Sequence, residues 1–239
     1  MPEPTSPGQE KHTLPVSPHP AGEETSPPSR QGSGTPLRAM LQEILETILF
    51  TLLIFFLVRT VIQNFRVDGA SMEPNLHTGQ YIMVNRLIYF HLDLNIPRRW
   101  LQREGDVEPR LAYLFHLPRR GDIVVFEYPR DSSRDFIKRV IGLPGEMVEI
   151  RDHQALINGI PLQEPYLPES ATTQMGDMAP VQVPANTVFV MGDNRGNSSD
   201  SRNWGPLPLN RIVGQAWFTY WPSRYWGAIP RAEPILAAP

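Results

Sequence analysis

The folding of this chain is constrained most by one long hydrophobic stretch, "LQEILETILFTLLIFFLVRTVIQNF", at residues 41–65. The uncharged part, residues 47–58, has only 12 residues, which is too short for a bilayer core of about 30 Å. If Glu46 and Arg59 extend toward the lipid headgroups, residues 41–62 form a helix about 33 Å long at 1.5 Å per residue. That length is enough to cross the bilayer.

Two other interpretations compete with a membrane span. A secretory signal does not fit well, because some 40 mostly polar residues precede the stretch and no small-x-small site follows promptly. A buried core helix has to accommodate residues 52–58, which are apolar on every helical face. We therefore predict one transmembrane helix over residues 41–63.

Residues 1–40 differ in kind from the remainder of the chain. The first 37 residues contain nine prolines and no aromatic residue. Such a segment cannot bury enough apolar surface to offset its chain entropy, so we expect a disordered tail. A proline-rich docking motif is the alternative, although no repeated P-x-x-P spacing supports it. Arginines are balanced on the two sides of the span, so the positive-inside rule leaves its orientation open.

Residues 64–239 read as a β domain. Short runs rich in Val, Ile, Phe and Tyr recur between turn residues, at 81–84, 122–128, 136–143, 187–191 and 212–221. Residues 147–162 read as a hairpin with an Asn158-Gly159 turn. We predict a mostly antiparallel, coiled-sheet domain, interrupted by loop excursions at 91–120, which has room for a short helix, and at 163–185.

Composition excludes several classes of function. The net charge is −3, which gives no reason to expect a nucleic-acid partner. The chain has no cysteine, so disulfides, zinc-thiolate sites and thiol catalysis are all excluded. Its six histidines are scattered without metal-ligand spacing. We expect no metal, no cofactor and no catalysis by a Ser-His pair.

Ser71 is the first candidate for chemistry. It lies in "GASMEPNLHTGQYIMVNR" (69–86), where Gly69 and Ala70 allow a close backbone approach. Most serines beside Gly and Pro serve turn geometry, so the residue is either a nucleophile or a hydroxyl that shapes a turn.

Lys138 is the second candidate, because it interrupts a run of β-branched and aromatic residues, "FIKRVIGLPGE". It is either a charge that protects an edge strand or a buried amine. A neutral amine at pH 7 requires a pKa depression worth roughly 4 to 5 kcal/mol, which desolvation can supply. Such an amine beside a serine hydroxyl is a workable general base.

A dense polar segment, "VMGDNRGNSSDSRNWGP" (190–206), follows the strand at 187–191. It is either an ordinary surface loop or a scaffold that orients a catalytic lysine. Trp204 and the preceding strand fix both of its ends, which favours the scaffold.

Taken together, these segments resemble the type I signal peptidase (leader peptidase) family. The motifs are "VDGASMEPNL", "RGDIVVFEYP", "DFIKRVIGLPGE" and "GDNRGNSSDSR", which occur in the family's order just after the apolar span. The resemblance covers about residues 41–221. It implies a membrane-bound serine endopeptidase with an extracytoplasmic catalytic domain at 64–239 and a cytoplasmic tail.

The resemblance also assigns roles. It implies that Ser71 is the nucleophile and provides an oxyanion N–H, that Lys138 is the general base, and that Ser198 orients the lysine amine. The implied supporting residues are Asp193, Arg195, Asp200 and Arg202. In some members a serine two positions before the nucleophile donates a second hydrogen bond to the oxyanion, but this chain has Gly69 there.

The implied substrates are preproteins with signal peptides that carry small residues at the first and third positions before the cut. The pocket for the first would involve Met72, Leu76 and Phe136. The pocket for the third would involve Phe65, Val67, Ile82, Val125 and Ile137. The substrate chain would lie extended beside the strand from Asp135 to Lys138.

Tryptophans and tyrosines in "AWFTYWPSRYWG" (216–227) suggest core packing for some rings and contact with the lipid bilayer for others. Two rival functions remain open on the sequence alone. A self-cleaving Ser-Lys repressor would need a DNA-binding module where this chain has a tail and a span. A catalytically inactive, membrane-anchored β module is the non-enzyme alternative, supported only by Gly69.

Overall fold

The structure is a computed structural model that describes residues 37–93, 111–113, 115–230 and 234–236. The chain divides into two units, Met1–Thr47 and Ile48–Pro239. Residues 1–36, which make up most of the predicted disordered tail, lie outside the described residues.

Helix α1 (Leu37–Val61) runs from the first unit into the second and contains the hydrophobic stretch. Its 25 residues give about 37 Å, and its most apolar 18-residue window has a mean hydropathy of 2.2 with no residue buried. The helix is therefore long and apolar enough to cross a bilayer. It begins earlier than the predicted 41 because residues 37–40 (Leu-Arg-Ala-Met) are good helix formers and add a turn.

The larger sheet has eight strands in the spatial order β1-β2-β13-β5-β6-β11-β12, with β14 paired to β13. Every pairing in it is antiparallel. Its strands are β1 (Ile62–Arg66), β2 (Tyr81–Asn85), β5 (Ile123–Tyr128), β6 (Asp131–Gly142), β11 (Thr187–Met191), β12 (Leu207–Pro208), β13 (Ile212–Trp221) and β14 (Gly227–Ala228). The predicted strand at 212–221 has the observed bounds.

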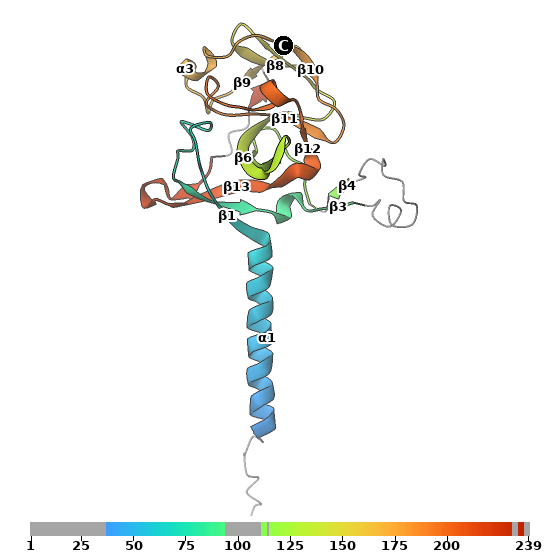
Figure 1. Cartoon of the computed structure of the whole chain (residues 1–239), viewed down its shortest axis with the longest axis vertical. Coiled ribbons are helices and arrows are strands. Elements are labelled where there is room, and N and C mark those ends of the chain that lie inside the picture. Colours follow the sequence, from blue (N-terminus) through green and yellow to red (C-terminus); the bar gives the residue numbers. More distant parts are fainter. Residues whose placement is uncertain (1–36, 94–110, 114, 231–233, 237–239) are drawn as a thin grey trace, which may run out of the picture. The chain divides into compact units, whose positions relative to one another are not determined.

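The second sheet has five antiparallel strands in the order β10-β7-β8-β9-β15. They are β7 (Met147–Arg151), β8 (Gln154–Ile157), β9 (Ile160–Gln163), β10 (Met178–Gln182) and β15 (Ile235–Leu236). Figure 1 shows β8, β9 and β10 gathered at one end of the β domain and β1 and β13 at the other, with β6 and β11 between them.

The remaining elements in the described part of the chain are short. They are the helices α3 (Glu169–Thr172), α4 (Ser201–Trp204), η1 (Leu87–Tyr89), η2 (Leu209–Arg211) and η3 (Ser223–Tyr225), and a two-stranded sheet of β3 (His91–Asp93) and β4 (Leu111–Tyr113).

Three predictions about loops need correction. Residues 147–162 form three strands with two turns, because Asp152 and His153 also adopt positive φ and turn the chain before β8. The 163–185 excursion contains α3 and β10, and β10 extends the second sheet by pairing with β7. Within the 91–120 excursion, for which a short helix was an option, residues 91–93 and 111–113 form the β3–β4 pair, while residues 94–110 lie outside the described residues.

The β domain is stabilised by three apolar clusters. One contains Val67, Met72, Leu76, Ile82 and Val125, on the face of the larger sheet that carries the Ser71 segment. Another packs Val124, Phe126, Val140 and Val190 together with the partly buried Phe136. The third joins the second sheet to β6 and β11 through Ile141, Phe189 and Met191.

Strand β6 takes part in all three clusters because neighbouring side chains alternate between its faces. Phe136 and Val140 belong to one cluster, Ile137 to a second and Ile141 to the third. Its 12 residues thus fix Lys138 between well-packed neighbours on both sides along the strand.

Candidate active site

Ser71 lies in a tight turn that follows β1. Gly69 adopts a φ of +88°, a value that residues with a Cβ rarely tolerate, and this turns the chain away from the strand. Met72 and Leu76 then anchor the segment, since both are almost fully buried and the Leu76 N–H donates to the Met72 carbonyl at 2.9 Å. The nucleophile candidate is thus supported by core packing on its C-terminal side.

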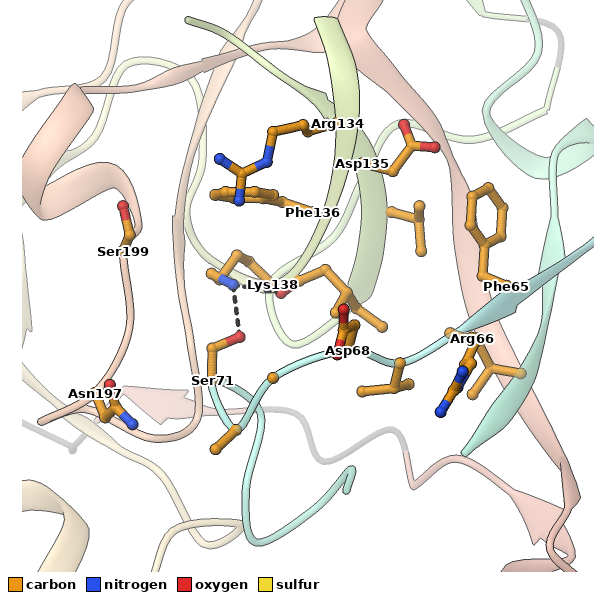
Figure 2. A pocket seen from close by; sticks show the side chains of 16 residues that line it. Phe65, Arg66, Asp68, Ser71, Arg134, Asp135, Phe136, Lys138, Asn197 and Ser199 are labelled. Carbon is orange, nitrogen blue, oxygen red and sulfur yellow. Dashed lines mark hydrogen bonds between the residues drawn. The ribbon is translucent and has the colours of Figure 1, made fainter. Parts of the chain in front are cut away.

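Lys138 projects from β6 toward this turn. Its Nζ lies 2.8 Å from Ser71 Oγ and also donates to the Ile137 carbonyl at 2.8 Å (Figure 2). Only 4% of the residue is exposed. The separation from Ser71 accommodates the hydrogen bond in either direction: an ammonium donates to Oγ, whereas a neutral amine accepts the Ser71 O–H.

Burial lowers the pKa of Lys138 from 10.5 to about 8. Desolvation is the largest cause, and the charges of Asp200 and Asp193 partly oppose it because they favour the ammonium. The charge of Arg202 adds to the lowering. With a pKa of about 8, about a tenth of the amines are neutral at pH 7, several hundred times the fraction of an ordinary lysine.

Three ion pairs build the polar segment that follows β11. Asp200 binds Arg202 with two short hydrogen bonds, of 2.8 and 2.7 Å, and caps α4 at its N-terminus. Asp200 also accepts the Gly192 N–H at 3.0 Å. This pairing links the start of the segment to its end.

Asp193 and Arg195 pair with other residues, not with each other. Asp193 accepts two hydrogen bonds from Arg139, at 2.8 and 2.7 Å, in a pair that is almost wholly excluded from solvent. Arg195 pairs with Glu164, which follows β9. The polar segment is therefore fixed both to the lysine strand and to the second sheet.

Ser198, which the resemblance assigns to orienting the amine, makes no such hydrogen bond in this structure. Its Oγ is buried without a hydrogen-bond partner among the described residues. It lies against Gly192, where a Cβ would come within 2.2 Å of it. Gly192 thus leaves the space that this hydroxyl occupies.

A groove of about 410 Å³ opens beside the Ser71–Lys138 pair. It brings together most residues expected to bind substrate, namely Phe65, Val67, Ile82, Val125, Asp135, Phe136 and Ile137. Met72 and Leu76 are not among its lining residues. They are about 1% and 2% exposed and anchor the turn in the core, so their place in the pocket for the first substrate residue stays a prediction.

One long edge of the groove is open backbone. Strand β6 pairs with β5 along residues 131–139, but its other edge pairs with β11 only from Arg139 onward. Within the described part of the chain, residues 134–138 therefore have no strand on their groove side. An extended peptide can add to such an edge through main-chain hydrogen bonds.

Charged side chains line the groove beyond the Ser71–Lys138 pair. Figure 2 shows Arg134, Phe136 and Lys138 in a column on β6, and the Arg134 guanidinium lies 5.3 Å from the centre of the Phe136 ring. Burial and, secondarily, the charge of Glu127 raise the pKa of Asp135. Among the described residues, no cluster of His, Asp or Glu has the arrangement of a metal site.

Sequence reasoning missed several partners in this site. Arg139, Glu164 and Asn75 were not singled out, although Arg139 directly follows Lys138 in the strand and a buried arginine there needs a carboxylate. Asn75 donates to Asp193 at 2.9 Å and to the Tyr166 carbonyl at 3.1 Å. No local signal indicated Glu164, because it lies in a segment interpreted as a loop.

Comparisons with known proteins point to one family. The family model described as "Signal peptidase, peptidase S26" matches residues 41–221. A signal peptidase I of Leptolyngbya laminosa is 33% identical over 207 residues, which cover 82% of this chain and 88% of that protein. A probable signal peptidase I-1 of Synechocystis sp. is 34% identical over 197 residues, covering 79% and 87%. A signal peptidase I of Bacillus amyloliquefaciens is 37% identical over 169 residues, covering 67% and 74%. With three quarters of its length matched by the family model and relatives of this extent, the chain belongs to the signal peptidase family, peptidase S26.

Proposed function

We propose that this chain is a membrane-anchored serine endopeptidase that removes signal peptides from secretory preproteins after a small-x-small site. Family membership supports the activity. The observation that carries the mechanism is a buried lysine amine 2.8 Å from a serine hydroxyl, beside a groove with an open strand edge.

In the proposed reaction, neutral Lys138 accepts the Ser71 proton as Oγ attacks the scissile carbonyl carbon. The C–O bond forms as the carbonyl π electrons move to the oxygen, giving an oxyanion near the Ser71 N–H. Collapse breaks the C–N bond, and the lysine ammonium returns the proton to the leaving amine. Water, deprotonated by the same amine, then hydrolyses the acyl-enzyme and regenerates Ser71.

Specificity would follow from the floor of the groove. Val67, Ile82 and Val125 are at most 3% exposed, so the space above them is set by packed core and does not yield to bulky groups. Small substrate residues fit this space, whereas larger ones clash. A substrate lying extended along Asp135 to Lys138 would place every second side chain toward the floor, as the small-x-small pattern requires.

We place α1 across the cell membrane, with the catalytic domain outside and residues 1–40 in the cytoplasm. This orientation follows from the proposed substrates, whose cleavage sites emerge on the outer side. The length and hydropathy of α1 support a single span. Exposed Trp221 and Trp226 are compatible with contact between the domain and lipid headgroups.

The test uses the full chain, purified in detergent, and a preprotein with an Ala-x-Ala site. Cleavage is followed by mass spectrometry of the released mature protein. We expect cleavage after the second alanine, its loss in Ser71→Ala, and its retention in Ser170→Ala, an exposed serine of α3 that serves as the matched control. Equal cleavage by wild type and Ser71→Ala would refute the proposal.

A further inference from the structure

Asn194, which lies in the polar segment after β11, binds the backbone on both sides of the nucleophile. Its side-chain Nδ2 donates to the Ala70 carbonyl at 3.0 Å. Its backbone N–H donates to the Ser71 carbonyl, also at 3.0 Å. One residue of the polar segment thus contacts two successive peptide groups of the Ser71 turn. Asn194 and Ala70 are 124 positions apart in the chain.

The first of these bonds bears on the oxyanion site through peptide geometry. The Ala70 carbonyl and the Ser71 N–H belong to one planar trans peptide group, in which C=O and N–H point in opposite directions. Fixing the direction of the carbonyl therefore fixes the direction of the N–H. A donor on the carbonyl also polarises the amide and strengthens the N–H as a donor.

The Ser71 N–H is available for this purpose. Among the described residues it has no protein acceptor, and the only bonds of Ser71 are those through Oγ and its carbonyl. Gly69 supplies no side-chain donor to share the oxyanion. The orientation of one N–H consequently matters more here than in a site where a hydroxyl donates as well.

Asn194 is held in place by its neighbours in the polar segment. Its neighbour Asp193 is fixed by the buried pair with Arg139, and its own carbonyl accepts the Asn197 N–H at 3.1 Å. The Ala70 carbonyl has a second donor, the Glu73 N–H at 3.2 Å, which closes the turn. Loss of the Asn194 side chain would therefore loosen the peptide group without unfolding the turn.

We infer that Asn194 is a positioning residue that aims the Ser71 N–H at the developing oxyanion. This inference rests on the proposed function, since it concerns the same reaction. It predicts that losing the Asn194 side chain lowers kcat and weakens the binding of an inhibitor that carries an oxyanion. The affinity for the ground-state peptide should not change.

The test compares Asn194→Ala, which removes the Nδ2 donor, with Asn194→Asp, which keeps the shape but places an acceptor against the Ala70 carbonyl. Both keep the backbone N–H bond to Ser71. Asn210→Ala and Asn210→Asp, at an exposed position in η2, are the matched controls. For each full-length variant, kcat and KM are measured on a signal-peptide substrate, together with the inhibition constant of a peptide aldehyde of the same sequence, whose hemiacetal oxygen occupies the oxyanion position.

We expect kcat to fall about 10- to 100-fold in both Asn194 variants, less than the roughly 10²- to 10³-fold loss on deleting a whole oxyanion donor. KM should stay within about twofold, aldehyde affinity should fall by the same factor as kcat/KM, and the acid limb of the pH profile should not move. An unchanged aldehyde affinity, a shifted acid limb, or loss of the folded state in both variants would overturn the inference. Because wild type and Ser71→Ala are assayed in parallel, failure of the proposed function is seen separately, as absent cleavage by wild type.

Discussion

Replacing Lys138 by Met should stabilise the folded protein at neutral pH. The buried amine has a pKa of about 8 in the folded state and an ordinary value near 10.5 when unfolded, so protonation favours the unfolded chain. The difference corresponds to about 3 kcal/mol at 1.36 kcal/mol per tenfold change in the protonation equilibrium. A Met side chain of similar length fills the site without a charge.

The sign of the pH dependence follows from the same two values. Below about pH 8 the amine of Lys138 is protonated in both the folded and the unfolded chain, so the buried charge destabilises the folded state by the full amount. Between about pH 8 and 10.5 only the unfolded chain binds it, so the wild-type free energy of unfolding rises with pH relative to Lys138→Met. From pH 7 to pH 10 the advantage of Lys138→Met should shrink by about 2 to 3 kcal/mol. Lys138→Met also removes the two hydrogen bonds of Nζ, which lowers the stability of the variant by a similar amount at every pH. This loss therefore does not alter the difference between pH 7 and pH 10.

The assay is urea unfolding of the full chain in micelles, followed by tryptophan fluorescence at a series of pH values. Lys11 is the only other lysine of the chain and supplies the matched control, Lys11→Met. That control should leave the free energy of unfolding unchanged at every pH. A Lys138→Met advantage that does not vary between pH 7 and pH 10 would refute the depressed pKa.

Three further predictions concern the same site. In protein labelled with 13C at lysine Cε, the signal that disappears in Lys138→Arg should titrate near pH 8; a titration of that signal near 10.4, the value of an ordinary lysine, would contradict burial of the amine. Phe136→Ala should admit water beside the amine and move the acid limb of kcat/KM to higher pH, because desolvation is the largest cause of the lowered pKa; an acid limb that stays in place would show that other residues desolvate Lys138. Ser198→Ala should lower kcat about tenfold with little change in KM, because the family resemblance gives this hydroxyl the role of orienting the Lys138 amine during the reaction, and it should cost no thermal stability, since the hydroxyl has no hydrogen-bond partner among the described residues; a wild-type kcat would exclude Ser198 from the mechanism.

Much of the fold could be predicted because the signals were local. Short runs rich in Val, Ile, Phe and Tyr between turn residues placed β2, β5, β11 and β13 to within a residue or so. A helix long and apolar enough to cross a bilayer was predicted from length and hydropathy, and α1 has both properties. β10 was missed because "MAPVQ" carries a proline and alternates weakly, and it becomes a strand only by pairing with β7.

The site could be predicted only in part. Sequence alone left Lys138 undecided between an edge charge and a buried amine, since that choice depends on what packs against the strand. The partners Arg139–Asp193 and Arg195–Glu164 are separated by tens of positions, and no spacing rule relates them. Met72 and Leu76 were assigned to the pocket by resemblance, but whether a side chain faces the groove or the core depends on how the turn is seated.

Neutral Lys138 is proposed to be the base that activates Ser71, and the decisive measurement of this role is the pH dependence of kcat/KM. The free-enzyme profile should show an acid limb with an apparent pKa near 8, falling tenfold for each pH unit below it. Lys138→Arg should show no cleavage at any pH in the range, because a guanidinium does not deprotonate there. A Lys138→Arg variant that keeps a tenth of wild-type kcat/KM, or a wild-type profile that stays level from pH 9 down to pH 6, would rule out Lys138 as the base.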